Sequence, residues 1–205
     1  KFKKVSHEIS TEMKSVGEVM ALGRNFEEVL QKALRMLQIG LQGFTANRKV
    51  KFATKNLEHD IRVPTPKRIL AISQALRQGI SPARIAKLTG IDLWFIEKMK
   101  NITKVEKKLA RGRCTAADLR EAKLLGFSDK QIGNIVGCSE AEVRELRKKL
   151  KIMPVIKQID TTAAEYPAHT NYLYMTYHGT KSDLKIDHRR KKIVAKSLLY
   201  YFRKN

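Results

Sequence analysis

Cysteine, histidine and long apolar runs are scarce in this 205-residue chain, and each scarcity excludes a class of protein. The two cysteines, Cys114 and Cys138, have no histidine or other cysteine at metal-ligand spacing, which predicts reduced thiols rather than a zinc site or a disulfide framework. No apolar run approaches the ~20 residues of a membrane-spanning helix, and the N-terminus lacks the apolar region of a signal peptide. The sequence therefore predicts an intracellular protein without a membrane partner.

Motifs that carry enzyme chemistry are also missing. The 11 glycines are dispersed, so no glycine-rich loop could cradle a phosphate, and no serine or cysteine stands in a nucleophile motif. No two histidines have the spacing of metal ligands; they are His7, His59, His169, His178 and His188. We therefore predict no catalytic, cofactor-binding or metal-binding residue in this chain, and no activity of the chain alone.

Acidic residues are few as well: 20 stand against 42 lysines and arginines, which gives a formal net charge of +22. Residues 61–153 are the most basic part, with 21 basic against 9 acidic residues. A positive field of this strength attracts phosphate backbones. A small DNA- or RNA-binding protein is therefore one hypothesis for the function.

A segment of this basic region occurs twice. The stretch from Gly79 to Lys100 returns, shifted by 47 residues, in a stretch that begins at Gly126. In each copy a capping residue opens each of two short helices and a glycine ends the first, which predicts a repeated helical hairpin. The caps are Ser81 and Asp92 in the first copy, and Ser128 and Ser139, the latter in a capping box with Glu142, in the second.

The pattern around the hairpins is helical too. Thr65 opens one amphipathic stretch, Thr115 opens another, and an apolar stripe runs from Phe95 to Leu109. The region from residue 64 to 153 is therefore expected to form roughly six helices with short connections. We predict a mainly α, bundle-like domain with an internally repeated helical hairpin.

The charges of the hairpins do not suit a helix that reads a DNA groove. The second helix of the first copy begins Asp92-Leu93-Trp94-Phe95-Ile96, an apolar run that we expect to be buried. The second helix of the other copy begins with Glu140 and Glu142, whose carboxylates would face phosphates. A helix-turn-helix nucleic-acid binder is therefore the alternative function, with a solvated basic surface as the simpler explanation of the charge.

Two segments flank the basic region. Residues 13–37, MKSVGEVMALGRNFEEVLQKALRML, contain an amphipathic helix with Asn25 as its N-cap. Residues 155–177 are rich in β-branched and aromatic side chains, which predicts extended chain or short strands. Asp160 and Glu165 in this segment have no visible base or metal partner, so we expect structural roles for both.

The flanks and parts of the repeats resemble one family. The segments MKSVGEVMALGR, NFEEVLQKALRM, IDLWFIEKM, GFSDKQI and KQIDTTAAEYPAHTNYLYMTYHG look like the middle of the large synthetase component of carbamoyl phosphate synthetase, in the family's order. The resemblance covers residues 1–184, and TNYLYMTY is similar to the eukaryotic forms. A motif near the family's first active-site body includes Lys14, Ser15, Glu18 and Arg24, for which we expect packing and loop-shaping roles.

The resemblance implies two similar α/β ATP-grasp units separated by a helical oligomerisation domain. It implies that the parent enzyme makes carbamoyl phosphate from bicarbonate, ATP and ammonia, with Mg²⁺ or Mn²⁺, for the pyrimidine or the arginine and urea pathway. A glutaminase subunit or domain, or free ammonia, would supply the nitrogen. The family's nucleotide- and metal-binding residues would lie outside this chain.

On that map we expect residues 1–45 to be the C-terminal tail of the first synthetase unit, and residues 46–153 to be the oligomerisation domain. Residues 154–184 would be the lead-in to the second synthetase unit. Residues 185–205 lack the glycine-rich turn that should follow, so we expect a divergent or non-native tail from a truncated or frame-shifted product.

The role implied for this chain is that of an interdomain scaffold. Its partners would be the remainder of the synthetase chain and a second copy, bound through an apolar helical face around Trp94, Phe95 and Met99. We expect the protein in the cytoplasm, with mitochondria as the alternative location.

Overall fold

The computed structural model describes residue 11 and residues 14–15, 18–47, 52–112, 114–163, 165–166 and 172–183. The chain divides into two units, Lys1–Met153 and Pro154–Asn205, named here the helical unit and the strand unit. The predicted mainly α fold is confirmed, since most regular structure in the described residues is helical. The predicted divergent tail, residues 185–205, lies outside the described residues.

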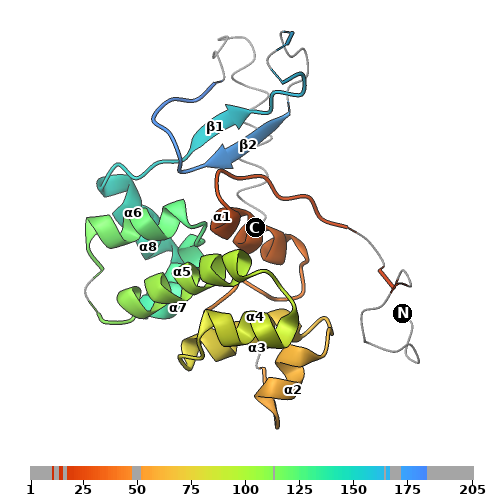
Figure 1. Cartoon of the computed structure of the whole chain (residues 1–205). Coiled ribbons are helices and arrows are strands. Elements are labelled where there is room, and N and C mark those ends of the chain that lie inside the picture. The colour runs from red at the N-terminus through yellow and green to blue at the C-terminus, as the bar shows by residue number, and fades with distance from the viewer. Residues whose placement is uncertain are drawn as a thin grey trace. The chain divides into compact units, whose positions relative to one another are not determined.

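The helical unit contains α1 (Phe26–Met36), α2 (Leu57–Arg62), α3 (Arg68–Arg77), α4 (Pro82–Thr89), α5 (Leu93–Leu109), α6 (Ala116–Leu124), α7 (Asp129–Val136) and α8 (Glu140–Lys149), as Figure 1 shows. Helices α3 to α8 correspond to the helices predicted between residues 64 and 153. α2 is an addition to the prediction, because its 6 residues are too few to show a helical period. The side chain of Ile61, on α2, is fully buried.

Most of the predicted helix caps are confirmed. The side chains of Asn25, Ser81, Asp92 and Ser128 each accept a hydrogen bond from a backbone N–H in the first turn of the helix that follows. Thr115 with Asp118, and Ser139 with Glu142, form capping boxes. These side chains satisfy N–H groups that have no partner within their own helix, so the starts of α1 and of α4 to α8 are fixed locally.

The start of α3 differs from the prediction. The helix begins at Arg68 rather than next to Thr65, and its N-cap Lys67 makes no side-chain cap bond. The carbonyl of Thr65 instead accepts a hydrogen bond from the N–H of Arg68, at 3.0 Å, in a turn that precedes the helix. The Thr65 signal therefore marks this turn and not the cap.

The duplication is longer than the two hairpins. The turn that joins α3 to α4 recurs between α6 and α7: the N–H of Ile80 donates to the carbonyl of Ala75, and the N–H of Phe127 to that of Ala122, both at 3.0 Å. The four turn glycines have left-handed φ values between +71° and +90°; they are Gly79, Gly90, Gly126 and Gly137. The repeated element is therefore three helices long, and α3, α4 and α5 match α6, α7 and α8.

α5 lies at the centre of the helical unit and contacts α1, α3, α4, α6 and α7. Its side chains Ile96, Ile102 and Leu109 are fully buried, as are Ile85 of α4 and Leu119 of α6. The buried positions of α5 follow a spacing of three or four residues, as expected for one face of a helix. The two copies of the repeat therefore share a core around α5.

The strand unit contains β1 (Val155–Gln158) and β2 (Leu173–Thr176), which pair antiparallel with Val155 opposite Thr176. The short strands predicted for this segment are thus confirmed. Asp160 accepts two hydrogen bonds from Thr162, each 3.0 Å long, and so shapes a local turn. The backbone N–H of Glu165 donates to the carbonyl of the same Thr162 at 2.9 Å.

Candidate functional site

The described residues contain neither a candidate metal site nor a helix that could span a membrane. Among them, no group of three or more histidine, cysteine, aspartate or glutamate side chains could hold a metal ion, and no helix is long and apolar enough to cross a membrane. Cys114 and Cys138 are free thiols. His59 lies in the helical unit and His178 in the strand unit, whereas the other three histidines lie outside the described residues. The candidate sites of the described chain are therefore its contact surfaces.

The motif that precedes α1 is held against the first turn of that helix. The backbone N–H of Arg24 donates to Oε2 of Glu28 at 2.8 Å, and a Cβ at Gly23 would lie 2.8 Å from the same oxygen. Arg24 and Gly23 thus take part in local packing. The other residues of the motif lie upstream, in chain without helix or strand; they are Lys14, Ser15 and Glu18.

Two buried amides join α1 to the second copy of the repeat. Nε2 of Gln131, on α7, donates to Oε1 of Gln31, on α1, at 2.7 Å, and both side chains are fully buried. Nε2 of Gln31 donates in turn to the carbonyl of Leu125 at 2.8 Å. A buried amide group without a partner is costly, so these bonds hold α1 in one position against α7.

Two glycines allow this close approach. A Cβ at Gly126 would lie 2.7 Å from Cα of Glu28, and a Cβ at Gly43 would lie 2.5 Å from Oε1 of Gln31. The carbonyl of Gly126 accepts a hydrogen bond from Nη1 of Arg35 at 2.9 Å. Burial lowers the pKa of Arg35 to about 10, although Glu28 acts to raise it. The backbone of the second copy thus lies directly against the backbone of α1.

The first copy also anchors α1 and the chain after it. Nδ2 of Asn101, on α5, donates to Oε1 of Glu27 at 2.9 Å. The buried Phe44 follows α1, and its carbonyl accepts a hydrogen bond from Oγ of Ser73, on α3, at 2.8 Å. α1 is therefore fixed on both copies of the repeat. These contacts of residues 26–44 are named the α1 joint.

An aromatic cluster lies beside the α1 joint. The ring of Phe26 meets the rings of Trp94 and Phe95 edge to face, with centroids 5.7 and 5.2 Å apart. Nζ of Lys98 lies 5.3 Å from the centre of the Trp94 ring. Despite these contacts, Leu93, Trp94 and Phe95 remain 45%, 52% and 40% exposed. Phe26, Leu93, Trp94 and Phe95 are named the aromatic face.

The burial predicted for the start of α5 is therefore wrong in part. Ile96 and Met99 are buried, whereas Leu93, Trp94 and Phe95 are exposed. Successive residues of an α-helix point about 100° apart, so four in a row cannot all face one core. Met99 was predicted to belong to the exposed face, but it is buried and does not.

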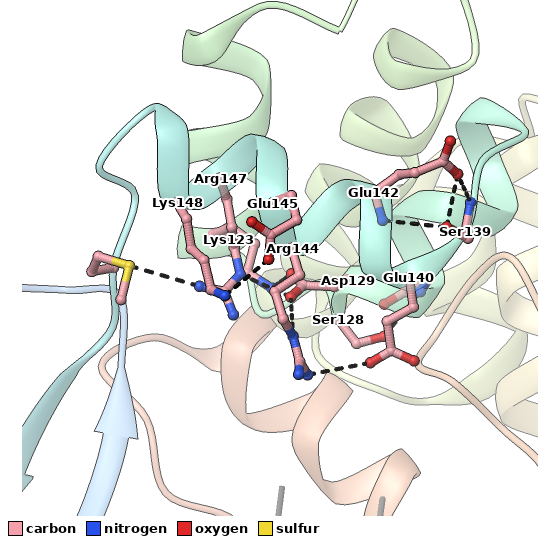
Figure 2. A network of polar contacts seen from close by, with 12 residues as sticks. Lys123, Ser128, Asp129, Ser139, Glu140, Glu142, Arg144, Glu145, Arg147 and Lys148 are labelled. Carbon is pink, nitrogen blue, oxygen red and sulfur yellow. Dashed lines mark hydrogen bonds and ion pairs between the residues drawn. The ribbon is translucent and has the colours of Figure 1, made fainter. Parts of the chain in front are cut away.

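A charged cluster joins α6, α7 and α8 in the second copy, and Figure 2 shows its members converging on Asp129. Nζ of Lys123 donates to Oδ1 of Asp129 and to the carbonyl of Phe127, both at 2.7 Å. Nε of Arg147 donates to Oδ2 of Asp129 at 2.8 Å. Burial lowers the pKa of Lys123 to about 8, against the raising effect of Asp129. Burial acts to raise the pKa of Asp129, but Lys123 and Arg147 outweigh it and lower that pKa.

The first copy has apolar residues at the two corresponding positions. Lys123 stands where the first copy has Leu76, and Asp129 stands where it has Pro82. The cluster was not predicted from the sequence. Aligning the two copies over all three helices would have revealed the exchange, because opposite charges replace two apolar residues together.

α8 begins with carboxylates, which bears on nucleic-acid binding. Glu142 closes the capping box of Ser139, and Oε1 of Glu140 lies 3.8 Å from Nη2 of Arg144. The basic side chains come later in the helix, and Arg147 is bound to Asp129. The first turn of α8 is therefore unsuited to contact with nucleic-acid phosphates.

Known proteins resemble this chain over most of its length. The family described as carbamoyl-phosphate synthetase large chain, oligomerisation domain, matches residues 18–151. Carbamoyl-phosphate synthase (ammonia), mitochondrial, of Aquarana catesbeiana is 49% identical over 185 residues, which are 87% of this chain and 12% of that protein. Multifunctional protein CAD of Squalus acanthias is 49% identical over 188 residues, which are 90% of this chain and 8% of that protein.

A fungal relative gives the same result. The arginine-specific large chain of carbamoyl phosphate synthase, mitochondrial, of Schizosaccharomyces pombe is 48% identical over 190 residues, which are 90% of this chain and 16% of that protein. The chain thus spans between 8% and 16% of the length of these relatives. The matched range, residues 18–151, contains α1 and both copies of the repeat. The chain therefore belongs to the carbamoyl-phosphate synthetase large-chain family, in the part that forms the oligomerisation domain.

Proposed function

We propose that this chain is the interdomain scaffold and oligomerisation module of an ATP-dependent carbamoyl phosphate synthetase. The parent enzyme would make carbamoyl phosphate from bicarbonate, ATP and either glutamine-derived or free ammonia, with Mg²⁺ or Mn²⁺ bound outside this chain. The names of the frog and fungal relatives support the synthetase activity for the whole protein. The arginine or urea pathway and the pyrimidine pathway are its two candidate settings.

The parts of the chain would divide as the family resemblance implies. Residues 1–45 would end the first ATP-grasp unit, residues 46–153 would be the helical domain, and residues 154–184 would lead into the second unit. The further partners would be the remainder of the synthetase chain and a glutaminase subunit or domain. The location would be the cytoplasm or mitochondria, since two of the relatives are named as mitochondrial.

One observation carries the scaffold proposal, and it is the α1 joint. The buried pair of Gln31 and Gln131, and the approach of Gly126 to Glu28, leave α1 a single position on the repeats. Because α1 is held in this way, the first synthetase unit would have a fixed position relative to the helical domain. α1 would thus help to set the distance and orientation between the catalytic units.

The aromatic face would be the place where a second copy binds. Single exposed apolar residues are ordinary, but Leu93, Trp94 and Phe95 are exposed together beside Phe26. Aromatic side chains are enriched at protein interfaces. Nucleic acid is not among the proposed partners, because α8 presents carboxylates in its first turn.

Trp94→Glu is expected to shift the chain toward the 23.5 kDa monomer in sedimentation velocity at high concentration. The substitution places a charge in the aromatic face, and an unpaired charge buried in an interface is costly. It should leave α5 folded, because a carboxylate is favoured in the first turn of a helix. Trp94 is the single tryptophan of the sequence, so tryptophan fluorescence reports on this position. In the unchanged chain, the emission maximum of Trp94 should move to shorter wavelengths as association rises.

Leu146→Glu is the matched control, since Leu146 is exposed on α8 and lies outside the aromatic face. This variant should sediment as the unchanged chain does. An unchanged chain that stays monomeric at the highest concentration would remove self-association from the proposal. Equal loss of association in both variants would show that the aromatic face is not the contact.

A further inference from the structure

A pocket of about 710 Å³ lies in the helical unit, near the end of α5 opposite to Trp94. It is lined by side chains from α3, α5 and α7, and by the loop residues Ala46 and Asn47. Its volume falls within the range of small-molecule sites, about 300–1,000 Å³. Both copies of the repeat and the chain that follows α1 therefore contribute to its wall.

A buried carboxylate forms part of this wall. Glu106 is 7% exposed, and its Oε2 accepts no hydrogen bond from the described residues. Nε of Arg77 lies 3.2 Å from this oxygen and forms an ion pair with it, although the geometry is not that of a hydrogen bond. Burial raises the pKa of Glu106, against the lowering effects of Arg77, the backbone of Ala46 and Lys107. Oε2 is thus a buried acceptor beside an open pocket, and a hydrogen-bond donor would satisfy it.

Positive charges and amides make up most of the remaining wall. Arg77 and Lys107 bring a guanidinium and an ammonium group to the same pocket. The amide side chains of the wall are Asn47, Gln74, Gln78 and Asn134. The pocket lining, within the described chain, has no aromatic ring. Such a wall suits a small polar ligand with charges of both signs rather than an apolar one.

We propose that this pocket binds a small zwitterion of the amino-acid class, with its ammonium group on Glu106 and its carboxylate on Arg77 and Lys107. An amine without a carboxylate would be repelled by the two cations. A carboxylate without an amine would bring no cationic donor to Oε2 of Glu106 and would add a second negative charge beside it. A ligand with both charges avoids each repulsion and forms charge-assisted hydrogen bonds on both sides.

Binding at this place would strengthen the helical unit. The ligand would bind α3 through Arg77 and α5 through Glu106 and Lys107, in a pocket that α7 of the second copy and the loop after α1 also line. A ligand that binds only the folded state stabilises that state by mass action. The pocket would therefore couple the concentration of a small molecule to the stability of the α1 joint, whether or not the chain self-associates.

Titration of the full chain, labelled with ¹⁵N, by L-serine in an NMR experiment tests the proposal. L-glycerate replaces the ammonium group of L-serine by a hydroxyl, and ethanolamine lacks its carboxylate, so each probe keeps one charge. We expect saturable shifts at Asn47, Gln74 and Asn134 with L-serine. The two single-charge probes should bind at least about tenfold more weakly. No saturable shifts with L-serine, or equal affinity for all three probes, would overturn the proposal.

Glu106→Gln distinguishes the zwitterion from a simple anion. The neutral amide should keep the fold, because burial opposes the charge of Glu106 more than Arg77 favours it, and the NMR spectrum checks this directly. The variant should bind L-serine about tenfold more weakly and L-glycerate more tightly, because the repelling carboxylate is gone. Weaker binding of both probes in a folded variant would contradict the assigned orientation of the ligand.

Lys107→Gln gives a second test at an exposed side chain, where the fold is not at risk. It should weaken L-serine binding about fivefold, the effect of losing one exposed ion pair. Lys104→Gln is the matched control, because Lys104 is exposed on the same helix but does not line the pocket. Equal effects of the two variants would show that bulk charge, and not this pocket, attracts the probe.

Discussion

Gly126→Ala is expected to lower the free energy of unfolding of the helical unit by roughly 2–5 kcal/mol. Gly126 has φ +82°, where an L residue costs about 1–2 kcal/mol. The new Cβ would also lie 2.7 Å from Cα of Glu28, and a helix backbone does not give way as a flexible side chain does. α1 would have to move away from the repeats, which would strain the buried bond between Gln31 and Gln131.

Gly79→Ala is the matched control for this prediction, because Gly79 holds the same place in the first copy. Its φ is +90°, but nothing lies within 4 Å of the added Cβ. This variant should lose only the backbone contribution, about 1–2 kcal/mol. Urea unfolding followed by circular dichroism gives both values. Equal losses in the two variants would show that α1 does not pack against Gly126 in solution.

Asp129→Ala is expected to cost about 3–5 kcal/mol, because it leaves a buried charge without its partner. Lys123 is 5% exposed, and its Nζ would lose the 2.7 Å bond to Asp129. Arg147 would lose its bond to the same carboxylate. The loss should appear as a lower midpoint in urea unfolding, with an unchanged dependence on urea concentration.

Lys123→Leu added to Asp129→Ala should recover most of that loss. The double variant has leucine where the first copy has Leu76, and a buried ion pair replaced by apolar groups is often neutral or stabilising. If the double variant is as unstable as Asp129→Ala alone, the loss does not come from the buried charge of Lys123. The charged cluster in Figure 2 would then stabilise the second copy in another way.

The helices were predictable because their start signals act over a few residues. Thr115 bonds to the backbone of Asp118, and Ser139 to that of Glu142, within one helical turn. The left-handed glycines, such as Gly90, mark helix ends by their own backbone preference. α2 was not predicted because so short a helix shows no periodic pattern of apolar residues. Such a pattern is a stronger signal of a helix than a capping residue alone.

The contacts that fix α1 could not be predicted from the sequence, because they join distant residues. Gln31 and Gln131 are 100 residues apart, and no neighbouring pattern marks them as partners. In the sequence, the place of Gly126 at a helix end already accounts for a glycine there. Its second role, the close approach to Glu28, therefore leaves no separate signal in the sequence. The pocket is non-local as well, since it brings Arg77 of α3 to Glu106 of α5.

The family was predictable for a different reason. The motifs in both flanks are long and occur in the family's order, whereas the charge and the hairpins alone left a nucleic-acid binder as an alternative. The apolar run at the start of α5 misled the burial prediction, because Leu93, Trp94 and Phe95 remain exposed in the described structure. Their exposure is the reason for assigning them to a contact with a second copy.

Native-state hydrogen exchange measures most directly whether α1 and the repeats form one scaffold. We predict that backbone amides in the middle of α1 exchange with the same free energy and the same dependence on denaturant as those of Ile102 and Val105 on α5. Such agreement would mean that α1 opens only when the whole helical unit unfolds. Exchange of α1 through a separate opening of lower free energy, while α5 stays protected, would contradict the α1 joint and the scaffold built on it.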